Sequence, residues 1–149
     1  MYYSYENFDA GIQMLADQVI HSGKKYDYLC GVLRGGMIPA IVLSYKLNIP
    51  VLPIHWSLRD FKQQYLSPDA RKIVLENKCL LVEDIIDTGE CISQLFKEIG
   101  KSLDVLCLVY NKSQSITPQF YHWCIDRNRN KDWIVFWWDE SNNIKFKKT

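Results

Sequence analysis

Amphipathic segments and short apolar runs alternate along the first two thirds of the chain. Apolar residues recur at helical spacing within segments 4–21, 37–47 and 92–99. Short apolar runs, typical of buried strands, lie between and beside these helices: 26–33, 51–56, 79–82 and 104–110. Strands that alternate with helices predict an α/β fold with a mostly parallel sheet flanked by helices.

The ends and faces of the expected helices can also be read from the pattern. Gly23 and Gly100 stand where the first and third helices should stop, since glycine readily adopts the left-handed C-cap conformation. The apolar face of the second helix is expected to comprise Ile38, Ile41, Val42 and Tyr45.

Two regions depart from the alternation. Segment 57–77 is polar and charged, which predicts a long loop, and long loops are often functional. Near the C-terminus we expect a strand at 120–125, a charged turn at 126–132 and an aromatic strand at 133–138. Because a strand alternates faces, the aromatic strand should present Trp133, Val135 and Trp137 on one side.

Composition narrows the setting of the protein. The 149 residues predict a single domain, 1–149, and a net charge of +1 implies no general attraction to nucleic acid or to an acidic membrane. No secretory signal is visible at the N-terminus, and no apolar run approaches the roughly 20 residues that span a bilayer. Five widely spaced cysteines suggest reduced thiols, so we expect a cytoplasmic protein.

Candidate chemistry follows three of the expected strands, as Arg34-Gly35-Gly36, the acidic stretch 83–89 and Lys112. In a parallel sheet, ligands bind beyond the carboxyl ends of the strands, so these clusters should meet at one edge. Glu83 and Asp84 can accept hydrogen bonds from sugar hydroxyls. The helix start after them offers backbone N–H groups to a phosphate. The sequence therefore predicts a site for a phosphorylated sugar.

The stretch Val82-Glu83-Asp84-Ile85-Ile86-Asp87-Thr88-Gly89 resembles the phosphoribosyl pyrophosphate (PRPP) signature of type I phosphoribosyltransferases, above all its hypoxanthine-guanine version. The resemblance implies that Glu83 and Asp84 hold the ribose hydroxyls and that Asp87 is the acid/base group near purine N7. The 5′-phosphate would be bound by Asp87, Thr88, Gly89, Glu90 and Cys91. Cys91 stands where many relatives have Thr or Ser, and Glu90 adds a negative charge near the expected phosphate.

Leu33-Arg34-Gly35-Gly36 resembles the pyrophosphate-binding loop of the same family. In that loop the peptide bond before the charged residue is often cis, which makes Leu33–Arg34 a candidate. The aromatic segment with Asp139 resembles the Trp-Ile-x-x-x-Trp-acid segment of short bacterial xanthine-guanine and xanthine-guanine-hypoxanthine phosphoribosyltransferases.

This resemblance implies a purine site and a cofactor. Trp133 would stack on the base, Ile134 would read its edge through the backbone, and Lys112 would donate to its 6-oxygen. Mg²⁺ would be held near Glu83, Asp84 and Asp139. A small C-terminal hood would be formed mainly by about residues 111–140.

The expected activity is transfer of the 5-phosphoribosyl group from PRPP to N9 of a 6-oxopurine (hypoxanthine, guanine or xanthine) in purine salvage. The 57–76 loop would close over the site. An adenine or pyrimidine transferase is disfavoured by Lys112, which has only donors. A non-catalytic PRPP- or nucleotide-sensing regulator of the same fold is the alternative. We expect Trp137 and Trp138 to be exposed, and homo-oligomers are common in the family. Both points predict a homodimer or homotetramer.

Overall fold

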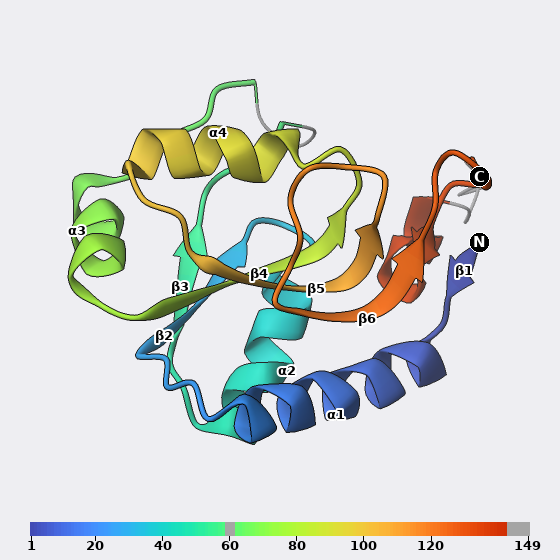
Figure 1. Cartoon of the computed structure of the whole chain (residues 1–149), viewed down its shortest axis with the longest axis horizontal. Helices are drawn as coiled ribbons and strands as arrows, with labels where there is room; N and C mark the ends of the chain where they lie inside the picture. Colours follow the sequence, from blue (N-terminus) through green and yellow to red (C-terminus); the bar gives the residue numbers. More distant parts are fainter. Residues whose placement is uncertain (59–61, 143–149) are drawn as a thin grey trace, which may run out of the picture.

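The computed structural model describes residues 1–58 and 62–142. Its main sheet has five parallel strands in the order β3-β2-β4-β5-β6 (Figure 1). The strands are β2 (Tyr28–Val32), β3 (Val51–Ile54), β4 (Cys79–Ile86), β5 (Asp104–Asn111) and β6 (Phe120–Ile125). The predicted α/β fold with a parallel sheet is confirmed.

Helices cover both faces of this sheet (Figure 1). The four helices of the described residues are α1 (Tyr5–Ser22), α2 (Met37–Leu47), α3 (Pro68–Glu76) and α4 (Glu90–Ile99). Alternate residues of β4 serve the two faces: Leu80 and Val82 pack with α1 and α2, whereas Cys79 and Leu81 pack with α3 and α4. Because the inner strands β2, β4 and β5 are buried on both faces, they read as continuous apolar runs.

The ends of α1 and α4 follow the predicted signals. Ser4 and Asn7 form a capping box at the start of α1, and Gly23 ends that helix with φ 71°. Gly100 ends α4 with φ 81°. Both glycines therefore adopt the left-handed conformation that the sequence indicated.

The predicted face of α2 is wrong in part. Tyr45 is 85% exposed and Ile41 is 45% exposed, whereas Pro39, Ala40 and Leu43 are buried. The helix is apolar on several sides, so its sequence alone did not decide which side the sheet would cover.

Strand β4 is longer than the predicted run 79–82. It continues through the acidic pair to Ile86, because Glu83, Ile85 and Ile86 pair with residues of β5. The prediction that the strand stops at the acids is wrong. A neighbouring strand of equal length keeps these residues in the ladder in spite of their charge.

The predicted loop 57–77 contains helix α3. The Ser67 hydroxyl accepts a hydrogen bond from the backbone N–H of Ala70, and Pro68 occupies the first turn. The helix packs through Val74, its buried residue. Residues 59–61 lie outside the described residues, so closure of this segment over the site remains a prediction.

A second, two-stranded sheet joins the N-terminus to the C-terminal region. Strand β1 (Tyr2–Tyr3) pairs in parallel with β7 (Val135–Phe136). The chain then turns into a 3-10 helix, η1 (Trp137–Asn142). The predicted aromatic strand 133–138 is therefore wrong in length, because β1, with which it pairs, has two residues.

The change from strand to 3-10 helix also redistributes the tryptophans. Trp133 is 64% exposed, whereas Trp137 and Trp138 are partly buried and pack against Phe8 of α1. Trp133 and Trp137 do not share a strand face as predicted. The exposure of Trp137 and Trp138, which supported the expectation of a homo-oligomer, is likewise not observed.

All five cysteines are free thiols, and Cys30, Cys79 and Cys107 are buried. Within the described residues, no helix combines the length and the apolar character needed to cross a membrane.

Candidate active site

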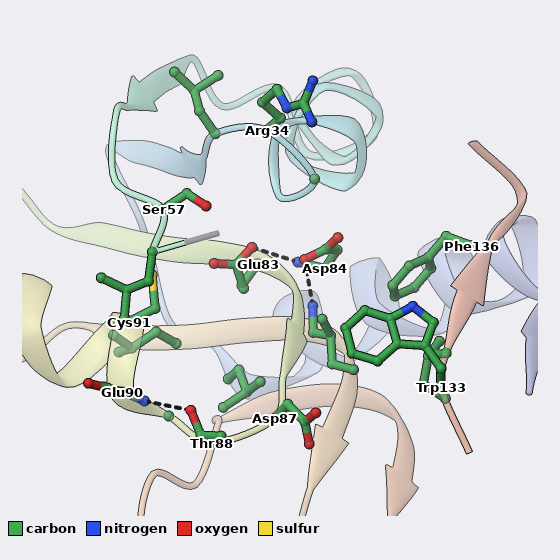
Figure 2. Close-up of a pocket in the computed structure, with 18 of the residues that line it drawn as sticks. Arg34, Ser57, Glu83, Asp84, Asp87, Thr88, Glu90, Cys91, Trp133 and Phe136 are labelled. Carbon is green, nitrogen blue, oxygen red and sulfur yellow. Dashed lines mark hydrogen bonds between the residues drawn. The ribbon is translucent and has the colours of Figure 1, made fainter. Parts of the chain in front are cut away.

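A cavity of about 360 Å³ opens at the carboxyl ends of β2 and β4 (Figure 2). It gathers side chains from the loop after β2, from the end of β4 with the turn into α4, and from the segment around β7. Of the predicted site residues it is lined by Leu33, Arg34, Gly35, Glu83, Asp84, Asp87, Thr88, Gly89, Glu90, Cys91, Trp133, Ile134 and Asp139. Two predicted residues, Gly36 and Lys112, do not line it.

The acidic pair lies at the centre of this group (Figure 2). Glu83 is 9% exposed and Asp84 is 6% exposed, so both carboxylates are held within the protein. Glu83 Oε1 accepts the Asp84 backbone N–H at 3.1 Å, and Asp84 Oδ1 accepts the Ile85 N–H at 2.8 Å. These bonds fix the orientation of both acids.

Their charge affects a thiol of the neighbouring strand. Burial, together with the charges of Glu83 and Asp84, raises the pKa of the Cys107 thiol well above its ordinary value. Cys107 is paired with Glu83 in the β4–β5 ladder and stays protonated there.

The loop after β2 packs directly against the acids. A Cβ on Gly35 would overlap the carboxylate of Asp84, and one on Gly36 would overlap the backbone carbonyl of Val82. Only glycine lets this loop approach so closely. The Leu33–Arg34 peptide bond is cis, as the sequence resemblance suggested.

The turn 87–91 places Gly89 at the N-cap of α4 with φ 77°. All five residues of the turn line the cavity, and the Thr88 hydroxyl accepts a hydrogen bond from the Glu90 backbone N–H at 3.3 Å, so the N-terminus of α4 lies at the cavity. The Glu90 carboxylate accepts a hydrogen bond from Gln94 at 3.2 Å and points away from Glu83 and Asp84 (Figure 2). The Glu90 carboxylate is therefore held by a residue one turn further along α4, and it does not point toward the acidic pair.

Cys91 has a structural partner in the segment after β3. Trp56 Nε1 donates to the Cys91 carbonyl at 3.1 Å, and Cys91 Sγ donates to the Trp56 carbonyl at 3.7 Å. This reciprocal pair ties the start of α4 to the segment that carries Ser57, another lining residue.

Asp87 has two partners that sequence reasoning missed. Arg127 donates to both carboxylate oxygens, with Nε–Oδ1 at 2.9 Å and Nη2–Oδ2 at 3.2 Å. Asn111 Nδ2 donates to the Asp87 carbonyl at 2.8 Å. Arg127 stands in the charged turn 126–132, where nothing in the sequence distinguishes it from the exposed Arg129.

Lys112 lies outside the cavity. Its Nζ is 3.5 Å from Asp126 Oδ2, and its side chain is 54% exposed. A hydrogen bond from the Ser113 hydroxyl, with help from the Lys112 charge, lowers the pKa of Asp126 below its ordinary value. The structure thus places Lys112 beside the site but in an ion pair directed to another acid.

Trp133 and Ile134 both line the cavity, and Figure 2 shows Trp133 on the side of the cavity that also carries Phe136. The exposed ring of Trp133 lines the cavity while the Ile134 side chain is buried in the core. Asp139 Oδ2 accepts the Phe136 N–H at 3.3 Å, so this acid braces the turn into η1.

The described residues do not supply a complete set of protein ligands for a magnesium ion here. Among residues 1–58 and 62–142, no three His, Cys, Asp or Glu side chains gather closely enough to hold a metal. Asp139 therefore does not join Glu83 and Asp84 in one cluster. The acidic pair still fits Mg²⁺, which is commonly bound through one or two carboxylates while substrate oxygens and water complete its shell.

Comparisons with known proteins agree with this geometry. A family model described as the phosphoribosyl transferase domain matches residues 1–145. A xanthine-guanine phosphoribosyltransferase of Idiomarina loihiensis is 26% identical over 141 residues, which is 91% of this chain and 84% of the relative.

Solved structures show the same relationship. A purine phosphoribosyltransferase of Pyrococcus horikoshii is 27% identical with a TM-score of 0.72, covering 93% of this chain and 92% of that one. A Helicobacter pylori xanthine-guanine-hypoxanthine phosphoribosyltransferase shares the fold, with a TM-score of 0.73 at 23% identity and coverage of 97% and 95%. The chain belongs to the type I phosphoribosyltransferases.

Proposed function

We propose that the protein transfers the 5-phosphoribosyl group of PRPP to N9 of a 6-oxopurine, and that it serves purine salvage. The relatives from Idiomarina loihiensis and Pyrococcus horikoshii are named as xanthine-guanine and purine enzymes, which supports a purine acceptor. The observation that carries the proposal is the shared cavity. It joins the buried acids, the glycine-rich loop and the start of α4 to the exposed ring of Trp133.

Each part of PRPP has a fitting partner in this cavity. The carboxylates of Glu83 and Asp84 accept hydrogen bonds from the ribose hydroxyls. The backbone of the 33–36 loop receives the pyrophosphate, while the turn 87–91 receives the 5′-phosphate at the N-terminus of α4. Trp133 offers the flat apolar surface on which a purine would stack.

The reaction exchanges one bond at C1′ for another. The C1′–O bond to pyrophosphate breaks, and pyrophosphate leaves with the bonding electrons as N9 forms its bond to C1′. Asp87 takes the proton that the purine loses, acting as a general base near N7. Positive charge develops on the ribose in the transition state, and the neighbouring carboxylates stabilise it.

Mg²⁺ would be held by Glu83 and Asp84 together with substrate oxygens, and it would neutralise charge on the leaving pyrophosphate. Because Lys112 has only donors, it favours a 6-oxo over a 6-amino purine. Lys112 forms an ion pair with Asp126 at a solvent-exposed position. Such pairs contribute little free energy, so the Lys112 side chain can leave Asp126 and reach a purine at small cost. A cytoplasmic location and a homodimer or homotetramer are parts of the same proposal.

A base panel tests the proposal. The protein is incubated with PRPP and Mg²⁺ and with hypoxanthine, guanine, xanthine or adenine, and nucleotide formation is followed. We expect product with at least one 6-oxopurine and little with adenine. Adenine as the best acceptor would overturn the role of Lys112, and binding of PRPP without product from any base would favour the nucleotide-sensing alternative.

A further inference from the structure

We propose that Arg127 is a positioning residue that joins the proton-accepting Asp87 to the purine-stacking loop, an inference that rests on the proposed function. The two residues lie far apart in the sequence and follow strands that are not neighbours: β6 is an edge strand of the sheet and β4 is its central strand. Arg127 follows β6, whereas Asp87 follows β4. Through this ion pair the Asp87 carboxylate is bonded directly to the loop that leads to Trp133.

The geometry of the pair is specific. Nε and Nη2 of Arg127 each donate to a different oxygen of Asp87, which fixes the plane of the carboxylate. The Arg127 side chain is 17% exposed and that of Asp87 is 35% exposed, so the pair is partly shielded from water. This distinguishes Arg127 from Arg129, whose side chain is 86% exposed.

The remaining nitrogen of the guanidinium bonds to the loop that carries Trp133, the residue proposed to stack on the purine. Nη1 of Arg127 donates to the carbonyl of Asp132, the residue directly before Trp133. One guanidinium thus holds both the proposed base and the loop that presents the stacking ring. Lysine could not do this, because all the donors of its ammonium are on one nitrogen, whereas the guanidinium carries donors on three nitrogens of a rigid plane.

Asn111 also takes part in the hydrogen-bonded network of Asp87, Arg127 and Asp132, which we call the Arg127 junction. This buried residue, 5% exposed, donates to the Asp87 carbonyl and accepts the Arg127 backbone N–H at 3.3 Å. It also directly precedes Lys112. One hydrogen-bonded network therefore links the three groups proposed to meet the purine. Asp87 is a member of it, while Lys112 and Trp133 each directly follow a member in the sequence.

This arrangement predicts a defined kinetic role. Misplacing a reacting group by about 1 Å can cost roughly a hundredfold in rate. Loss of Arg127 should therefore lower kcat and raise the purine KM. The PRPP KM should change less than the purine KM, because the guanidinium of Arg127 bonds to Asp87 and to the carbonyl of Asp132, the residue before Trp133.

The test compares Arg127→Ala, Arg127→Lys and the matched control Arg129→Ala, with thermal unfolding as the check on folding. We expect Arg127→Ala to lose about tenfold or more in kcat, Arg127→Lys to recover only part, and Arg129→Ala to match the wild type. A fully active Arg127→Lys would overturn the bridging role. If Arg127→Ala does not fold, Arg127→Gln takes its place.

A double-mutant cycle separates positioning from direct substrate contact. If Arg127 acts on the proton transfer through Asp87, the kcat of the double variant Asp87→Asn with Arg127→Ala should be no lower than that of Asp87→Asn alone, while the purine KM rises further because the bond to Asp132 is also lost. Losses in kcat that multiply would overturn the proposal and point to a direct contact between Arg127 and substrate.

Hydrogen exchange provides a readout that needs no activity. Amides of 126–134 should exchange faster in Arg127→Ala than in the wild type or Arg129→Ala. Unchanged exchange would contradict the proposal. A wild type that is inactive with every base but shows the expected exchange difference would refute the proposed function while leaving the Arg127 junction intact.

Discussion

Gly35 and Asp84 lie in direct contact, although one follows β2 and the other lies within β4. The contact joins the proposed pyrophosphate loop to the proposed ribose-binding acids without any side chain between them. Asp84 cannot easily yield, because its carboxylate is buried and bonded to the Ile85 N–H. The absence of a Cβ at position 35 is therefore a requirement of the site.

Gly35→Ala should fold but bind PRPP poorly, because the added methyl group displaces the Asp84 carboxylate. We expect kcat/KM for PRPP to fall about a hundredfold. Gly100→Ala is the matched control, since nothing lies within 4 Å of its Cβ and its φ is +81°. That control should lose about 1–2 kcal/mol of stability and keep its PRPP KM. Normal PRPP kinetics in Gly35→Ala would contradict the contact.

Lys112→Met should raise the KM for hypoxanthine and narrow the preference for hypoxanthine over adenine. The substitution removes the donor to a 6-oxygen while it keeps the length of the side chain. Steady-state kinetics with both bases measures the effect, and Lys131→Met, an exposed lysine of the same region, is the control. An unchanged ratio between the two bases would show that Lys112 does not reach the purine.

Trp133→Ala should weaken purine binding without loss of stability, since the ring is 64% exposed. Stacking of a base on an aromatic ring contributes about 1–3 kcal/mol, so the purine KM should rise roughly 5- to 150-fold. Melting temperature and steady-state kinetics separate the two effects. Tyr45→Ala removes a more exposed ring on α2 and should change neither quantity. A purine KM that stays constant in Trp133→Ala would exclude stacking.

His122 should make the protein less stable as the pH falls. The Tyr3 hydroxyl bonds to His122 Nδ1 at 2.7 Å, and burial lowers the pKa of His122 below 6.5. The unfolded chain therefore binds a proton on His122 that the folded protein resists, and the free energy of unfolding declines from about pH 7 toward pH 5.

Denaturant unfolding across this pH range measures the effect. His122→Gln should flatten the decline. Tyr3→Phe should lower stability at every pH but keep the decline, because burial rather than the hydrogen bond causes the pKa shift. A decline that persists in His122→Gln would assign it to other groups.

The sequence by itself determined the sheet, most of the helices and the place of the site. Periodicity and glycine caps are local signals, and they located α1, α2 and α4 and the strands of the main sheet. The rule that ligands bind at the carboxyl ends of parallel strands then placed Arg34, Glu83 and Asp87 together, and one cavity is lined by all three.

Tertiary structure alone decided what depends on distant partners. Strand β4 runs through its acids because β5 lies alongside, and the aromatic segment stops being a strand where β1 ends. The ion pair of Arg127 with Asp87 arises only when the loop after β6 reaches the turn after β4. From the sequence alone, a charged residue in a turn is expected to be exposed to solvent. Its partner is decided only by the packing of the whole sheet.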